Sequence, residues 1–385
     1  MNRNVPVSPE SVDRQESPVS KRPLQSLEIA MILADAVTVR RITVCHDGNI
    51  TMFMMPYAAA FVAASLEYFR ACGMAKGSLG EHEQRVWRAR QSVKLLDERG
   101  VLPRARLDRL GGIVAAHRRE FVDRHQGLLR PVQRFLQPDL GLYFQGEDLV
   151  ATTHHLTNHF GFDDARIDAM GTIALGDDNA TQQEFARVMG EYIANVLEKF
   201  GQELKPPSRA TPTIQSRDVK SRHLYGRLVL DATGDGAAMA LASALATANL
   251  ARVTLPKILS STDDIEEAFL AKWTIVSLFH AKSAIEIVLS QHHRREVLRP
   301  NIVTSLVALQ RRLRSLGEQR PLRNVLMHYA IDDVDLSGDN TLARLIAVMS
   351  RRPYRDFRRG VSDALLDLAT TLQVCIFGDG PTVAA

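Results

Sequence analysis

The chain has 385 residues, of which 45% are hydrophobic and 24% are charged. This balance is that of an ordinary globular protein and excludes a fibrous or low-complexity chain, and the length predicts two domains, or one domain with a large helical extension. A formal charge of +4 permits an anionic partner without requiring one. The three cysteines, Cys45, Cys72 and Cys375, form no metal-spaced pair, so they favour a reducing, cytoplasmic setting.

Residues 1–23 are predicted to be a disordered leader, because they are rich in Ser, Pro and charge and offer little apolar surface. They lack the apolar core of a signal peptide. The most apolar run, residues 50–66, is interrupted by Pro56 and is followed by Glu67 and Arg70. It falls short of the roughly 20 residues that a membrane span needs, so we expect a buried helix and no membrane association.

Residues 24–204 are predicted to form an N-terminal helical domain with a sensing, regulatory or partner-binding role. The helices expected in it begin near Ser26 and at Pro103 and cover residues 81–98 and 184–200. A linker rich in Pro, Ser and Thr, residues 205–220, ends this domain.

A histidine-rich stretch in this half offers one alternative site. His155 and His159 are four residues apart, so on a helix both could bind a metal ion, with Asp163 as a carboxylate ligand. No Glu follows the first His, as a zinc-protease motif would require. Histidines clustered at a helix end are the simpler interpretation, and neither a metal nor another cofactor is predicted.

Residues 221–378 are predicted to form a second helical domain, followed by a flexible tail over residues 379–385. It begins with a short strand or extended segment over residues 223–230. The later helices are expected at residues 237–251, 265–293, 303–316, 342–349 and 354–376. Asp263 and Asp264 cap the longest of them. The predicted fold class is therefore all-α, with two helical domains, the second an antiparallel helix bundle.

The stretch from residue 320 to residue 332 has the pattern of one more helix, with Pro321 in its first turn. Apolar residues recur on one face of it: Leu322, Val325, Leu326 and Tyr329. A polar stripe of Asn324, His328 and Asp332 crosses that face, with Arg323 beside it. An arginine, an amide and a histidine are thus predicted to share one small patch beside buried residues.

This patch has the chemistry needed to break a phosphodiester, and no metal is required for it. Arg323 can bind a phosphate through two charge-assisted hydrogen bonds and keeps its charge at any ordinary pH. His328 titrates near neutral pH, so it can accept or donate a proton. Asp332 could orient the imidazole if it faces the ring.

The patch resembles the signature of the HEPN superfamily, in which an Arg is followed by a polar residue, about three variable positions and a His. Here the signature stands as Arg323-Asn324-Val325-Leu326-Met327-His328. The resemblance implies a HEPN-like bundle over residues 225–378, and a homodimer in which two motifs form one composite site. It also implies that Arg323 holds the scissile phosphate, that His328 acts as general base or acid, and that Asn324 positions one of them.

One HEPN subgroup, the toxins silenced by a nucleotidyltransferase, carries a tyrosine two residues after the His. Here Tyr329 follows His328 directly, so that form of control is not expected, and Tyr329 and Asp332 are assigned supporting roles. Spacing alone is weak support, because Arg41 and His46 are also five residues apart. Arg323, unlike Arg41, is followed by an amide.

Arginines around the motif favour single-stranded RNA as the substrate. The residues predicted to contact it are Arg320, Arg351, Arg352, Arg355 and Arg358. The last four lie among Tyr354 and Phe357, a mixture that suits RNA because guanidinium groups bind phosphates and rings stack on bases. Taken singly, each cluster is also explained as a solvated helix face.

The resemblance therefore implies a metal-independent endoribonuclease, a regulated toxin or phage-defence effector that cleaves RNA through attack of the 2′-OH. Its expected partners are an RNA substrate, a second copy of the chain and a regulatory protein. The alternative is a non-catalytic helical module that binds a partner protein or a nucleotide through the same patch.

Overall fold

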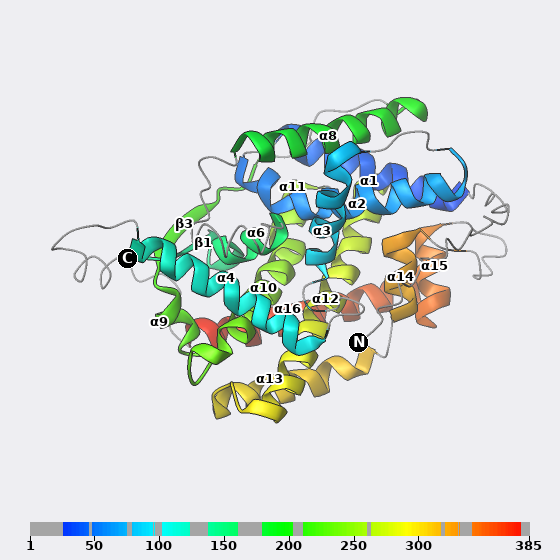
Figure 1. Ribbon diagram of the computed structural model, residues 1–385. Coiled ribbons are helices and arrows are strands. Elements are labelled where there is room, and N and C mark those ends of the chain that lie inside the picture. The colour runs from blue at the N-terminus through cyan, green and yellow to red at the C-terminus, as the bar shows by residue number, and fades with distance from the viewer. Residues whose placement is uncertain are drawn as a thin grey trace, which may run out of the picture.

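A computed structural model describes most of the chain (Figure 1). The described residues are 26–45, 48–74, 79–94, 96, 102–123, 138–160, 179–202, 211–259, 263–316, 320–329, 331 and 341–378. The predicted leader, residues 1–23, and the predicted tail, residues 379–385, lie outside them.

The described chain is mostly α-helical, as predicted, with one small sheet. The helices before residue 205 are α1 (Ser26–Cys45), α2 (Gly48–Ala71), α3 (Glu83–Val93), α4 (Pro103–Asp123), α6 (Thr153–Phe160) and α8 (Asn179–Lys199). Those after residue 220 are α9 (Ser221–Tyr225), α10 (Asp235–Asn249), α11 (Leu255–Ile258), α12 (Asp264–Arg295), α13 (Pro300–Leu313), α14 (Arg320–His328), α15 (Leu342–Ser350) and α16 (Tyr354–Phe377). Shorter turns of helix are η1 (Gly80–His82), η2 (Ala232–Gly234), η3 (Leu250–Thr254) and η4 (Arg314–Leu316).

The longest helix, α12, begins where the sequence predicts. The Asp263 carboxylate accepts hydrogen bonds from the backbone N–H groups of Ile265, at 3.0 Å, and Glu266, at 3.2 Å, which satisfies two donors of the first turn. At the other end Glu296 adopts a left-handed backbone with φ 51°. Between these ends α12 packs against α1, α10, α13, α14 and α16, so it is the central helix of the fold.

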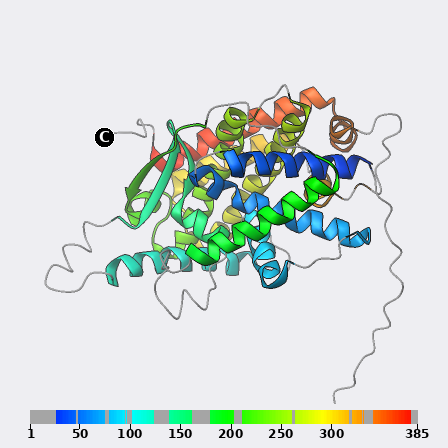
Figure 2. The same cartoon turned by 90° about the horizontal axis from the view of Figure 1, so that it is seen from above.

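The sheet was not predicted. It contains β1 (Leu140–Gln145), β2 (Asp148–Thr152) and β3 (Gln215–Val219), all antiparallel and in the order β2-β1-β3. Gly146 has φ 63°, a left-handed conformation that favours glycine, and the tight turn that contains it joins β1 to β2. The strands gather at one end of the molecule, and α14 and α15 lie at the other (Figure 2).

The prediction of a linker over residues 205–220 is wrong for its second part. Residues 215–219 form β3, which pairs with β1 of the preceding half from Leu140↔Val219 to Phe144↔Gln215. Through this pairing, β1 supplies hydrogen-bond partners for the backbone N–H and C=O groups of a polar segment. The side-chain pattern of residues 215–219 does not predict such partners. Residues 203–210 lie outside the described ranges.

One hydrophobic core extends across the predicted domain boundary. It includes Ile32 and Val62 from the first half and Leu241 and Val276 from the second. Across the boundary, α4 packs against α10, α1 against α12, and α2 against α14. The boundary therefore does not separate two independent cores.

The contact of α4 with α10 is close because both helices carry glycine there. A Cβ atom built on Gly236 would lie 1.9 Å from the carbonyl oxygen of Leu107, and one on Gly111 would lie 3.5 Å from the nitrogen of Gly236. Two backbones can approach this closely only where no side chain separates them.

The expected strand over residues 223–230 is instead the short helix α9 and a turn. The cause lies in the first turn, where the Asp139 carboxylate accepts hydrogen bonds from the Ser221 backbone N–H, at 2.6 Å, and hydroxyl, at 2.5 Å. Val229 forms only an isolated bridge, with Leu298.

Three helical segments are long and apolar enough to cross a membrane by length and composition: Gly48–Ala71, Ala232–Ile258 and Tyr354–Phe377. The first corrects our expectation that the run after Gly48 is too short for a span, because α2 has 24 residues. As predicted, this helix is buried, and 83% of its apolar window lies inside the fold.

Candidate functional site

The helix that carries the Arg–His motif, α14, lies on the rest of the fold with its predicted apolar face inward. Leu322, Val325, Leu326 and Tyr329 are all buried. The helix contacts α2, α12 and α15. It ends at His328, because Tyr329 adopts a left-handed backbone with φ 52°.

The helix predicted from residue 320 to residue 332 ends earlier, at His328, because Tyr329 adopts a left-handed backbone. The part of the predicted polar stripe that lies on α14 is therefore Asn324 and His328. The backbone N–H of Ile331 donates to the Glu28 carboxylate of α1 at 3.0 Å. Asp332 lies outside the described residues.

Tyr329 is fully buried in an ionic cluster that joins three helices. Its hydroxyl donates to the Asp35 carboxylate of α1 at 2.5 Å, and the ammonium of Lys272, on α12, donates to the same oxygen and lies 3.2 Å from the hydroxyl. Burial raises the pKa of Asp35 and lowers that of Lys272, and each partner opposes the shift of the other. Tyr329 thus anchors the end of α14 and does not face solvent.

His328 lies against two residues of the first half. Nη2 of Arg90, on α3, is 2.7 Å from Nδ1 of His328, and Oε2 of Glu67, on α2, is 3.7 Å from the same nitrogen. Arg90 also contacts Glu67 at 3.3 Å, so a guanidinium, an imidazole and a carboxylate form one cluster. The His328 side chain is 35% exposed, whereas that of Arg90 is 3% exposed.

The contacts at Nδ1 suit both protonation states of the ring. A guanidinium can only donate, so in the neutral ring Nδ1 accepts from Arg90 and the proton lies on Nε2. A doubly protonated ring would instead direct its Nδ1–H towards Glu67. The pKa of Glu67 is lowered, first by its interaction with His328 and, against the effect of burial, by Arg90, so this carboxylate is ionised at neutral pH.

Arg323 contacts Asn324, its neighbour in the motif. Nη2 of Arg323 donates to Oδ1 of Asn324 at 3.0 Å. Side chains five residues apart on an α-helix point in directions about 140° apart around the axis, so Arg323 and His328 project from different faces of α14. Asn324 and His328 are four apart and do share a face of α14.

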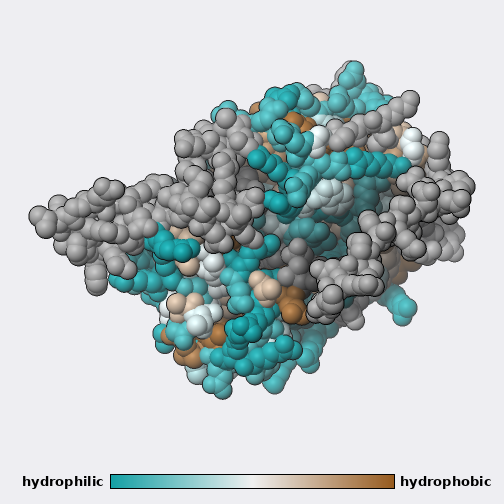
Figure 3. Space-filling view, in the orientation of Figure 1, coloured by the Kyte–Doolittle hydropathy of each residue, from teal (hydrophilic) through white to brown (hydrophobic). Residues whose placement is uncertain are grey.

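The arginines predicted to contact RNA have different surroundings. Arg320, Arg351, Arg352 and Arg355 are exposed. Arg358 is half-buried and ion-paired with Glu267 of α12, which also accepts a hydrogen bond from the Tyr354 hydroxyl at 3.0 Å. Its charge is therefore already matched within the chain. The face seen in Figure 3 is mainly hydrophilic, with small separate hydrophobic patches.

The alternative metal site on α6 gains no support from the described geometry. His155 is buried, and burial lowers its pKa to about 3. The side chains of His159 and Asp163 lie outside the described residues. Within the described part of the chain, no three His, Cys, Asp or Glu residues are placed to hold a metal ion.

Two residues of the cluster, Glu67 and Arg90, were not predicted from the sequence. One signal for Arg90 exists, because it recurs with Val86, Ala89 and Val93 on the apolar face of α3, where a charged residue needs a partner. The sequence shows no corresponding signal for Glu67, which is half exposed at the end of an apolar helix.

Comparison with known proteins adds no relative. No protein-family model, no curated protein and no solved structure matches this chain.

Proposed function

We propose that this chain is an endoribonuclease in which His328 transfers protons and Arg323 binds the scissile phosphate. The observation that carries the proposal is the surface-accessible imidazole of His328, held at Nδ1 between Arg90 and Glu67. A positioned imidazole next to permanent positive charge is suited to acid–base chemistry on a phosphodiester. The HEPN resemblance, which supplies the reaction, rests on the residues of α14.

The proposed reaction is the attack of a ribose 2′-oxygen on the adjacent phosphorus. The 2′-OH gives its proton to a neutral imidazole, the new P–O bond forms, and the bond to the 5′-oxygen breaks. An imidazolium gives a proton to that leaving oxygen, and the products are a 2′,3′-cyclic phosphate and a 5′-OH. Two copies of His328, one from each protomer of a homodimer, would supply the base and the acid.

Residues of this chain support each role. Glu67 orients the ring, because its carboxylate lies 3.7 Å from Nδ1. Arg323, held by Asn324, would bind the phosphate oxygens on which charge develops. Arg90 is deeply buried, so it acts by positioning His328 rather than by contacting RNA.

A non-catalytic helical module remains the second candidate, and one observation favours it. The cluster of Glu67, Arg90 and His328 also attaches α14 to α2 and α3, a role that needs no substrate. In that case the polar patch would serve contact with a partner protein or a nucleotide.

RNA cleavage by matched variants separates the two candidates. Single-stranded RNA is incubated with EDTA and with wild type, Arg323→Ala, His328→Ala or the control His223→Ala, which replaces an exposed histidine of α9. Because His328→Ala loses general acid–base catalysis, its rate of RNA cleavage is expected to fall by about 100-fold or more, while the control keeps the wild-type rate. Equal rates in all four folded proteins would contradict the proposed site, and no cleavage by any of them would leave only the non-catalytic module.

A further inference from the structure

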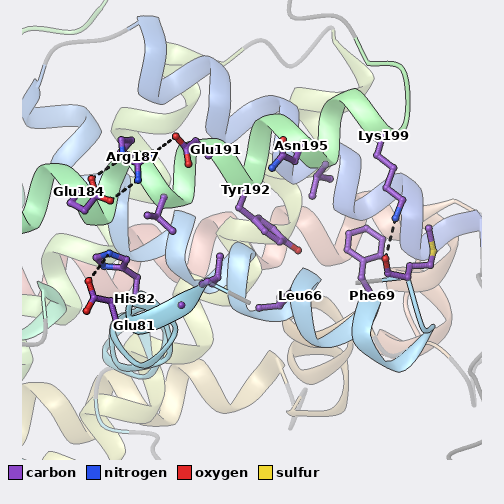
Figure 4. A pocket seen from close by; sticks show the side chains of 15 residues that line it. Leu66, Phe69, Glu81, His82, Glu184, Arg187, Glu191, Tyr192, Asn195 and Lys199 are labelled. Carbon is purple, nitrogen blue, oxygen red and sulfur yellow. Dashed lines mark hydrogen bonds and ion pairs between the residues drawn. The ribbon is translucent and has the colours of Figure 1, made fainter. Parts of the chain in front are cut away.

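A cavity of about 560 Å³ lies between the C-terminal part of α2, the short helix η1 and α8 (Figure 4). It lies on a different side of α2 from the His328 cluster, because Leu66 and Phe69 line it whereas Glu67 contacts His328. Its volume falls within the range of about 300–1,000 Å³ that is typical of small-molecule sites.

One part of the cavity lining is apolar. Its apolar side chains are Leu66, Phe69, Met74, Leu79, Val188 and Val196, with Phe69 and Met74 near Lys199. The ring of Tyr192 adds an aromatic surface, and its hydroxyl is hydrogen-bonded to Ser65 at 3.1 Å. This part of the cavity suits the aliphatic or aromatic body of a ligand.

One end of the cavity carries an excess of carboxylates. Arg187 contacts both Glu184 and Glu191, and Glu81 projects from η1 on the opposite side (Figure 4). Three carboxylates therefore line this end of the cavity with one guanidinium, which contacts two of them, so carboxylates are in excess. The His82 ring is 11% exposed, and its Nε2 lies 3.7 Å from Glu81, beyond hydrogen-bond distance.

The cation at the other end, Lys199, is already held by the fold. Its ammonium donates to the backbone carbonyl of Met74 at 3.3 Å and lies 5.9 Å from the centre of the Phe69 ring. A positive charge there disfavours a second cation at that end. A cationic group of a ligand in the cavity is therefore expected at the Glu184 end.

We propose that this cavity binds a small amphipathic amine. Its ammonium group lies between Glu81, Glu184 and Glu191, where it neutralises the excess charge, and its apolar body lies on Leu66 and Val196. The ring of Tyr192 contributes a face to which organic cations are attracted.

The test is calorimetric titration of the full chain with three probes of one shape: 4-phenylbutylamine, 4-phenylbutan-1-ol and 4-phenylbutanoate. The amine is expected to bind at least about tenfold more tightly than the alcohol, and the carboxylate more weakly still. An amine that does not bind, or that binds no better than the carboxylate, overturns the proposal.

Variants locate the binding. The double substitution Glu184→Gln/Glu191→Gln is expected to weaken binding of the amine about tenfold and to leave binding of the alcohol unchanged. It removes only exposed charges, so the fold is expected to stay intact. Val188→Trp, at a half-buried position of the lining, is expected to abolish binding of both. The control Glu286→Gln removes a carboxylate of α12 with 43% exposure outside the cavity and should change nothing. Amine binding that survives Val188→Trp places the ligand elsewhere and contradicts the proposal.

Discussion

Asp35, Lys272 and Tyr329 show how single buried polar residues join elements that are far apart in the sequence. Asp35 and Lys272 have side chains that are 1% and 4% exposed, so each needs the other as a partner. Lys272 stands out in the sequence as a polar residue on the apolar face of α12, yet its partner, 237 positions away, cannot be read from any local pattern.

Removing one member of this cluster should destabilise the protein strongly. Lys272→Met leaves the Asp35 carboxylate buried with Tyr329 alone, so we expect a loss of about 3–5 kcal/mol in the free energy of unfolding, measured with urea. The double variant Asp35→Leu/Lys272→Met should recover much of this loss. Lys282→Met, which removes a more exposed ammonium of the same helix, should change stability by less than about 1 kcal/mol. A Lys272→Met protein as stable as the Lys282→Met control would contradict this role.

Buried histidines make stability depend on pH. His117 contacts Thr157 at 3.1 Å and its ring centre lies 4.7 Å from that of His154, which contacts the Tyr225 hydroxyl at 2.9 Å. Burial lowers the pKa of His117 to about 4 and that of His154 well below its usual value. In the unfolded chain these groups titrate near the ordinary value of about 6.5.

Between about pH 6.5 and pH 4 the unfolded state therefore binds protons that the folded state does not, so stability falls as the pH falls. His117→Gln should reduce the dependence of the unfolding free energy on pH by about 1.4 kcal/mol per pH unit in this window. The exposed His223→Gln is the control and should keep the wild-type slope. Parallel curves for wild type and His117→Gln would show that His117 is not kept neutral by the fold.

At the scale of elements, most helices could be predicted because their causes are local. Apolar periodicity, Pro103 at the start of α4 and the Asp263 cap of α12 all lie within the elements that they define. The errors lie where a distant partner decides the structure. Polar β3 is a strand because β1 is beside it, and α9 is a helix because Asp139 binds Ser221.

The candidate site follows the same division. The apolar face of α14 could be inferred from spacing. The hydrogen bond of Arg323 to Asn324 could not, because adjacent residues on a helix do not face each other. The end of α14 at His328 and the contacts with Glu67 and Arg90 depend on α1, α2 and α3, so the motif alone could not predict them.

The contact between α4 and α10 can be tested with a pair of glycines. Gly236→Ala places a Cβ atom against the Leu107 backbone carbonyl, so one helix must shift, and we expect a loss of about 3 kcal/mol or more in unfolding free energy. Gly112→Ala, in α4 with nothing within 4 Å of the new Cβ atom, should instead stabilise by about 0.5–1 kcal/mol. A Gly236→Ala protein with wild-type stability would mean that the helices are further apart.

For the whole molecule, the shared core predicts that the two halves unfold together. The chain has two tryptophans, Trp87 in the first half and Trp273 in the second. Trp273→Phe leaves Trp87 as the only indole, and Trp87→Phe leaves Trp273. In each variant the urea midpoint from fluorescence should coincide with the midpoint from far-UV circular dichroism. A Trp87 signal that changes before the helical signal would show separate folding units.

The chemistry of the RNA ends is the most direct test of the central claim that His328 drives cleavage through the 2′-OH. The products formed by wild type and by His328→Ala are analysed by mass spectrometry after incubation with EDTA. We expect 2′,3′-cyclic phosphate and 5′-OH ends from wild type and about 100-fold less product from the variant. Ends with a 5′-phosphate, or the same amount of product from folded His328→Ala, would contradict the proposed reaction.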